Sequence, residues 1–139
     1  MRQPVSRLAD MLGTMHPVLH DTVYVFACVP RHTDLQSLEP LATFHEEEGL
    51  TLIIEEQRAL KANLPVVFRA AWITLSVHSD LQGVGLTAAV STALAHANIS
   101  CNIVAAVFHD HLFVPVEAGH EALAVLQALQ SRQSKASPS

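Results

Sequence analysis

A polar, glycine-containing segment at residues 79–87 has the residue types that bind a small charged molecule. It contains Ser79, Asp80, Gly83 and Gly85, and an apolar series at helical spacing follows it. A helix that begins just after Gly85 exposes its first backbone N–H groups, and the missing glycine side chains let a ligand approach them. The N–H groups and the helix dipole favour a carboxylate, whereas the carboxylate of Asp80 favours an ammonium group. The segment therefore suits a zwitterionic amino acid.

The same glycines have a simpler explanation, which is that they only shape a tight turn between a strand and a helix. A second polar group, His109-Asp110-His111, offers two imidazoles on alternate residues. They would face the same way only if strand geometry continued through them, and no third metal ligand follows nearby. We expect a hairpin turn there, in which Asp110 accepts backbone hydrogen bonds, and no metal site.

Catalytic patterns are missing from the sequence. His45-Glu46-Glu47-Glu48 is not the HExxH pattern of metalloproteases, and no P-loop or GxGxxG segment occurs. Ser79 directly follows His78, and neighbours on a strand point to opposite faces, which argues against a nucleophile–base pair. We expect a protein that is not an enzyme and needs no cofactor.

Composition excludes several classes of partner. The chain has 139 residues, is 50% hydrophobic and carries a net charge of −5 with 8 unclustered basic residues. Nucleic acids and anionic membranes require concentrated positive charge, so neither is an expected partner. No signal peptide or membrane-spanning run is predicted. Cys28 and Cys101 each lie in an apolar run, which is typical of buried thiols in a reducing compartment. We therefore expect a cytoplasmic protein.

Periodicity predicts the elements that hold these residues. Residues 4–15 have a helical apolar face, residues 22–29 have strand composition, and residues 30–40 form a proline-bounded loop. Next come a hairpin and a short helix, at residues 41–44, 50–54 and 55–62.

The second half of the chain has clearer patterns. Alternation over residues 71–78 predicts a strand, and a helix follows over residues 86–97. Two further strands, a final helix and a disordered tail are expected at residues 101–108, 112–114, 117–130 and 131–139.

Both halves have the same order of elements, which predicts an α+β fold. Strand, connection, strand, strand and helix is the order of a ferredoxin-like sandwich, with an antiparallel sheet and helices packed on one face. We place the units at residues 1–66 and 67–130. Each lacks an obvious final strand, although residues 66–68 could supply one, so the halves should pair and chains could pair as well.

Three segments carry a resemblance to a known family. They are Val84-Gly85-Leu86-Thr87-Ala88-Ala89, Leu94-Ala95-His96-Ala97-Asn98-Ile99-Ser100 and His109-Asp110-His111-Leu112-Phe113-Val114-Pro115. Through them the chain resembles the ACT-domain superfamily, in particular short bacterial proteins with two ACT-like units. Its second half is also similar to the ACT units of the CASTOR family of arginine sensors.

The resemblance implies a regulatory ferredoxin-like module that binds an amino acid beside the loop between the first strand and the first helix. Gly85 and Leu86 resemble the positions whose backbone receives the ligand, and Asp110 resembles a carboxylate that contacts the ligand's side chain. Gly83 differs, because the arginine sensors have an acidic residue there. The candidate ligand-binding residues are therefore Ser79, Asp80, Gly83, Val84, Gly85, Leu86, Thr87 and Asp110.

Two other functions stay open at this point. The chain could be a purely structural or protein-interaction module that forms homodimers or higher homo-oligomers without a small ligand. It could also be a metal-dependent enzyme that uses His109 and His111. The leading hypothesis is a module that binds a small molecule such as an amino acid.

Overall fold

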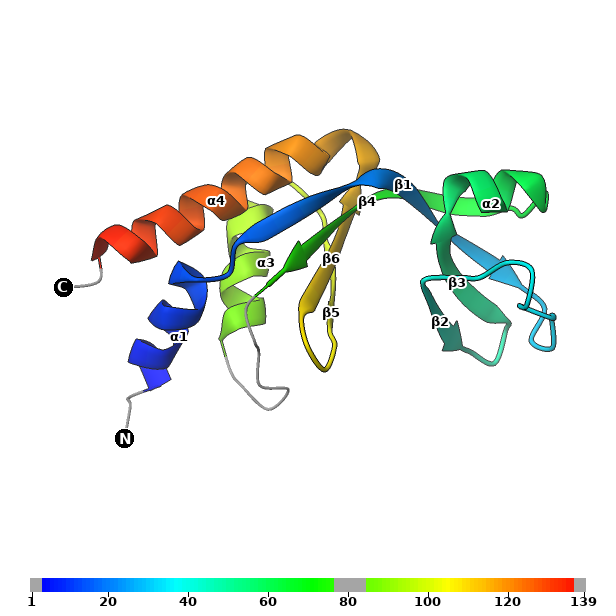
Figure 1. Cartoon of the computed structure of the whole chain (residues 1–139), viewed down its shortest axis with the longest axis horizontal. Helices are drawn as coiled ribbons and strands as arrows, with labels where there is room; N and C mark the ends of the chain where they lie inside the picture. Colours follow the sequence, from blue (N-terminus) through cyan, green and yellow to red (C-terminus); the bar gives the residue numbers. More distant parts are fainter. Residues whose placement is uncertain (1–3, 77–84, 137–139) are drawn as a thin grey trace.

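The computed structural model describes residues 4–76 and 85–136, which form helices on one side of a single sheet (Figure 1). The helices are α1 (Pro4–Gly13), α2 (Glu56–Lys61), α3 (Leu86–His96) and α4 (Gly119–Ala136), with a 3₁₀ turn at Val116–Ala118. The strands are β1 (Pro17–Val29), β2 (Ala42–His45), β3 (Leu50–Glu55), β4 (Val66–Leu75), β5 (Asn102–Ala105) and β6 (Asp110–Pro115).

Strands β1 and β4 belong to both halves of the molecule. The 6-stranded sheet has the order β2-β3-β1-β4-β6-β5, and every neighbouring pair is antiparallel. The amino-terminal unit uses β4-β1-β3-β2 and the carboxy-terminal unit uses β1-β4-β6-β5, which are two copies of one ferredoxin-like strand order. Each half thus obtains its missing fourth strand from the other half, and the expected tandem α+β fold is confirmed. The proposed boundary between residues 66 and 67 falls at the start of the shared β4.

Two separate clusters of buried side chains hold the helices against the sheet. The carboxy-terminal core joins α1, α3 and α4 to β4 and β6, and its fully buried members include Ile73, Val90 and Leu112. The amino-terminal core packs α2 and the loop before β2 against β1 and β3, around Leu52 and Ile54. Burial of such side chains contributes roughly 1.5–3 kcal/mol each, so both clusters stabilise the fold strongly.

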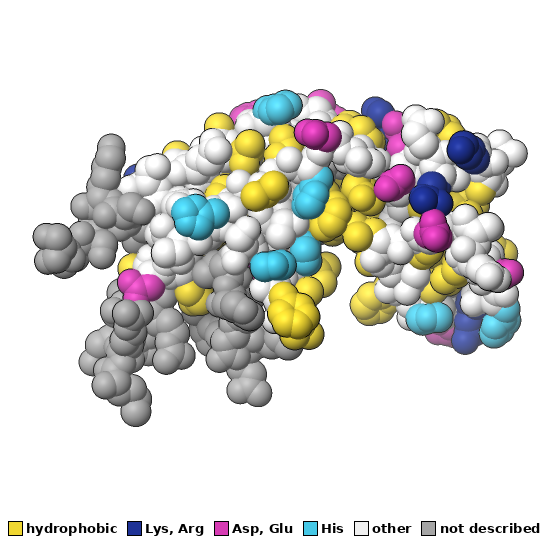
Figure 2. All heavy atoms as spheres, in the orientation of Figure 1, with side chains coloured by type: hydrophobic (Ala, Val, Ile, Leu, Met, Phe, Trp, Pro, Cys, Tyr) yellow, Lys and Arg dark blue, Asp and Glu magenta, His cyan; other side chains and the backbone are white. Residues whose placement is uncertain are grey.

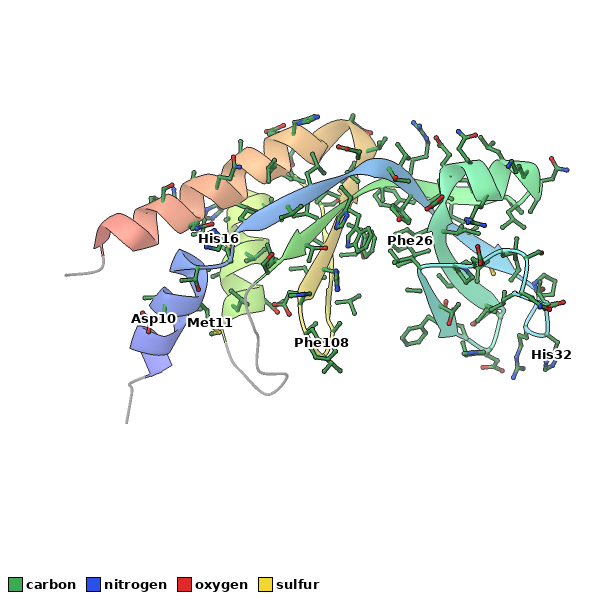
Figure 3. All side chains as sticks on the ribbon, in the orientation of Figure 1. Asp10, Met11, His16, Phe26, His32 and Phe108 are labelled. Carbon is green, nitrogen blue, oxygen red and sulfur yellow. The ribbon has the colours of Figure 1, made fainter. Side chains whose placement is uncertain are left out.

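The predicted turn at residues 109–111 is wrong. Strand β5 ends at Ala105, and the turn is closed by a 3.0 Å hydrogen bond from the Ala106 N–H to the carbonyl of His109. Asp110 and His111 are the first residues of β6, where Asp110 lies opposite Leu75. Pairing of β6 with β4 determines this register, even though it leaves Val107 and Phe108 exposed at the hairpin tip (Figure 3).

Three other local expectations also change. Strand β1 begins at Pro17 instead of Thr22, because its first residues pair with the end of β4. Helix α4 continues to Ala136, so residues 131–136 are helical and not disordered. The two cysteines, expected to be buried, are not: Cys101 is partly buried and Cys28 is exposed. Cys28 is exposed because it lies on the side of β1 away from the amino-terminal core. The hairpin of β2 and β3, α2 and α3 lie where the sequence predicts them.

Candidate functional site

The predicted binding segment is only partly within the described residues. Ser79, Asp80, Gly83 and Val84 lie outside them. The described candidates fall on two elements: Gly85 precedes α3, Leu86 and Thr87 open that helix, and Asp110 opens β6.

Helix α3 begins as the sequence predicts. Its first backbone hydrogen bond runs from the Ala89 N–H to the carbonyl of Gly85, at 2.8 Å. The N–H groups of Leu86, Thr87 and Ala88 open the helix, and among the described residues no side chain caps this helix end. Leu86 is buried, whereas the side chain of Thr87 is exposed. The start of α3 can therefore offer backbone donors to an anion.

Gly85 has a structural reason to be glycine. Its φ angle is 108°, a conformation that residues with a side chain rarely adopt. A Cβ atom added there would also lie 3.1 Å from Cδ2 of Leu8 on α1. The glycine thus shapes the turn and lets α1 approach the start of α3, as the simpler sequence interpretation proposed.

Asp110 is the buried carboxylate of the described part of the chain, with an exposed fraction of 2%. It lies opposite Leu75, the last residue of β4, from which the chain continues toward α3. A buried carboxylate is stable only where polar groups or charges accompany it. Strand pairing thus places a negative charge at the sheet end from which the predicted ligand loop departs.

A second polar group, which residue spacing in the sequence does not indicate, lies on the sheet face opposite the helices. Trp72 Nε1 donates a hydrogen bond to Nδ1 of His111 at 3.1 Å. Thr74 Oγ1 lies 3.2 Å from the same nitrogen and 2.8 Å from Nε2 of His20. The rings of His20 and Trp72 stack with centroids 3.6 Å apart. Alternation in β4 indicated that Trp72 and Thr74 share a face, but not that two histidines join them.

Both histidines of this network favour the neutral form. Burial lowers the pKa of His111, and His109 and His20 lower it further, while Asp110 raises it. Burial likewise lowers the pKa of His20, against an opposing effect of Asp21. An indole N–H can only donate, so Nδ1 of His111 is an acceptor and its proton lies on Nε2.

We predict that acid weakens the fold through these histidines. A histidine has an ordinary pKa of about 6.5 in an unfolded chain, so the unfolded state takes up protons before the folded state does. The free energy of unfolding should be highest above that pH and fall as the pH drops from there through the lower pKa of the folded protein. Urea unfolding at several pH values measures this free energy. His111→Gln should flatten this dependence and His45→Gln, on the exposed edge strand, should not; equal slopes for all three proteins would contradict the prediction.

The two imidazoles considered for a metal belong to the turn before β6 and to β6 itself. The ring centroids of His109 and His111 are 6.4 Å apart, and Nδ1 of His111 already accepts the Trp72 hydrogen bond. Among the described side chains, no three of the types His, Cys, Asp and Glu gather as a metal site would require.

Within the described residues, no helix has the length and apolar character needed to cross a bilayer.

The strand order and the helix-covered face define a tandem ferredoxin-like protein, and sequence comparison defines its family. Models of the ACT domain match residues 3–71 and residues 67–128. The two matches overlap in β4, the strand that both units share. The chain therefore belongs to the ACT-domain family, as its resemblance to that family predicted. No protein with curated functional information matches the sequence.

Solved structures agree with this assignment. A Vibrio cholerae protein of unknown function, described as a possible transport protein, is 43% identical, with a TM-score of 0.83 over 92% of this chain and 99% of that one. The regulatory subunit of aspartate kinase from Thermus thermophilus is 11% identical, with a TM-score of 0.64 over 81% of this chain and 95% of that one. E. coli aspartokinase III, in complex with aspartate and ADP, is 12% identical, with a TM-score of 0.57 over 81% of this chain and 32% of that one. The two kinases show the fold alone.

Proposed function

We propose that this ACT protein is a regulatory module that binds a free amino acid at the start of α3, and that it is not an enzyme. ACT domains are typically regulatory domains that bind small ligands, and both units of this chain match them. The proposed site contains Ser79, Asp80, Gly83, Val84, Gly85, Leu86, Thr87 and Asp110.

The beginning of α3, which no side chain of the described residues caps, carries this proposal. A carboxylate of the ligand would accept hydrogen bonds from the first N–H groups of the helix, where the dipole is favourable. The ammonium group of the ligand would lie near Asp80, and Asp110 would interact with its side chain. This assignment predicts that the ligand is a zwitterion whose side chain is polar or basic.

We also propose that the protein is a cytoplasmic homo-oligomer. Strands β2 and β5 are the two edges of the sheet, and an unpaired edge can accept a strand from another copy. Every residue of β2 is exposed. Light scattering tests this, since a monomer at all concentrations would contradict it.

A structural or interaction module without a small ligand is the second candidate. Exposed apolar side chains near these edges favour it, since Phe44 is 70% exposed and Val104 is 52% exposed. The two candidates differ in one measurable respect, because only the first requires stabilisation by a free amino acid.

A thermal-shift panel of amino acids therefore tests the proposal. A ligand at a hundredfold above its dissociation constant adds about 2.7 kcal/mol to the free energy of unfolding. In a chain of 139 residues, this should raise the melting temperature by about 10 °C. If no amino acid raises the melting temperature, the interaction module becomes the better description.

The variant Thr87→Glu tests whether the ligand binds at the start of α3. The side chain is exposed in the first turn, so the new carboxylate should leave the free protein as stable as before or add about 0.5 kcal/mol. It should repel the ligand's carboxylate, weaken binding at least about tenfold, and reduce the thermal shift by about half. Thr92→Glu, an equal change at an exposed position further along α3, is the control and should bind normally. Equal binding by both variants would place the ligand elsewhere.

A further inference from the structure

The sheet face opposite the helices is hollowed into a trough between the two hairpins. Two adjoining cavities of about 340 and 330 Å³ share Ala42, Ile53, Val104 and Phe113 as lining residues. β2 and β3 form one wall, and β5 and β6 form the other. Figure 2 shows hydrophobic side chains on both sides of this hollow, and Figure 3 shows Phe26 of β1 between the two walls. A cavity of this volume is in the range that binds small molecules.

The walls of the trough are mainly apolar, and the polar side chains of the smaller cavity are Thr43, Thr51 and Asn102. None of the residues lining either cavity is Lys, Arg, Asp or Glu. Aromatic rings form the floor, where Phe113 contacts Phe26 edge-to-face with centroids 5.7 Å apart and stacks parallel to Trp72 at 6.3 Å. A charged group would lose its hydration here without gaining an opposite charge, so the trough selects against ions.

One polar side chain, His111, lines the larger cavity, together with the indole of Trp72. Its Nδ1 atom is occupied by the Trp72 N–H and the Thr74 hydroxyl, so its proton lies on Nε2. Among the described residues, Nε2 has no hydrogen-bond partner. The stack of His20 on Trp72 and the 2.8 Å hydrogen bond between His20 Nε2 and the Thr74 hydroxyl hold this arrangement in place. The cavity therefore combines an apolar wall with one neutral hydrogen-bond donor.

We propose that the trough is a second ligand site, which binds an uncharged, mainly apolar small molecule through a carbonyl or similar acceptor bonded to Nε2 of His111. This ligand class differs from the zwitterion proposed for the start of α3. The apolar side chains at the mouth, such as Leu41 and Phe44, supply further contact surface for the part of the ligand outside the cavity.

Three matched probes test the chemistry of this site: acetophenone, ethylbenzene and benzoate. They have similar size but carry a carbonyl, no acceptor and a charge, respectively. Trp72 is the single tryptophan, so its indole N–H gives one NMR signal beside the site. Acetophenone should shift this signal with a dissociation constant of about 10 mM or tighter. Ethylbenzene should bind about fivefold more weakly, and benzoate at least tenfold more weakly.

Four variants test whether the probes bind in the trough. His111→Phe retains an aromatic ring but removes the Nε2 donor, so acetophenone and ethylbenzene should bind equally. His109→Phe is the control, because His109 lines neither cavity. This control should preserve the difference in affinity between the two probes. Ala42→Phe should fill the trough and abolish binding, whereas Thr87→Glu should have no effect, which separates this site from that at α3. Preferential binding of benzoate, or no acetophenone shift at Trp72, would overturn the proposal. So would a Trp72 signal that moves with protein concentration alone, because a second copy would then cover this face.

Discussion

Leu52→Ala in the amino-terminal core should destabilise the whole molecule, including the carboxy-terminal unit that Leu52 does not contact. Leu52 is fully buried, and removing such a side chain typically costs about 3 kcal/mol. Its strand β3 pairs with β1, which continues through the other unit alongside β4. Because β1 and β4 complete both units, we expect the units to unfold together.

Two spectroscopic signals measure this coupling. Trp72 fluorescence reports on β4 beside β6, and far-UV circular dichroism reports on all helices and strands. In Leu52→Ala both signals should show one coincident transition, lowered by about 10 °C. Leu112→Ala, an equal truncation at a fully buried position of the other core, should behave in the same way. Leu60→Ala, at a side chain that is 58% exposed, should change little.

A different result would show that the units are independent. In that case Leu52→Ala would give an early transition in circular dichroism, while the Trp72 transition would stay at the wild-type temperature. Two separate ferredoxin-like domains would then describe the chain better than one sheet with shared strands.

Gly85→Ala should lower the free energy of unfolding by about 2 kcal/mol. Two physical causes contribute: the φ angle of 108° is unfavourable for any residue with a Cβ atom, and that atom would lie 3.1 Å from Leu8. The side chain of Leu8 can move by a few tenths of an ångström, so we expect the backbone conformation to contribute most of the loss.

A double-mutant cycle with Leu8→Ala separates the two causes. Leu8→Ala removes the close contact but leaves the φ angle unchanged, so Gly85→Ala should still cost most of its full effect in that background. Gly119→Ala is an instructive comparison, because the φ angle of Gly119 is an ordinary −57°. Its added Cβ would lie 2.9 Å from Cβ of Ala71, which cannot move away as easily. A neutral Gly85→Ala in both backgrounds would contradict this explanation of the turn.

Much of the fold could be predicted because it depends on local patterns. The apolar spacing of α3 and the polar turn between β2 and β3 are properties of short segments, and both lie where expected. Residues 66–68 were expected to supply a missing strand, and they open β4, which pairs with β1. That β1 in turn completes the second unit was not predictable in the same way, since it depends on tertiary pairing. The turn after β5 was misplaced because His109-Asp110-His111 looks more polar than Val107-Phe108, although cross-strand pairing determines the register.

The two candidate sites also differ in how far the sequence could reveal them. Gly85 and Asp110 stood out by residue type and by family resemblance, and strand pairing places Asp110 opposite the last residue of β4, the strand that precedes α3. The network around Trp72 could not be found from spacing. His20 reaches it through an irregularity in β1 between Leu19 and Val23, where the register with β4 shifts.

The central claim is that an amino acid binds at the start of α3. The most direct test is a ¹H–¹⁵N NMR titration with the amino acid that most raises the melting temperature. The backbone signals of Leu86, Thr87 and Ala88 should shift most, because their N–H groups would bind the ligand's carboxylate, and Asp110 should shift with them. Largest shifts in the trough or at the edge strands, with an unchanged start of α3, would contradict the claim.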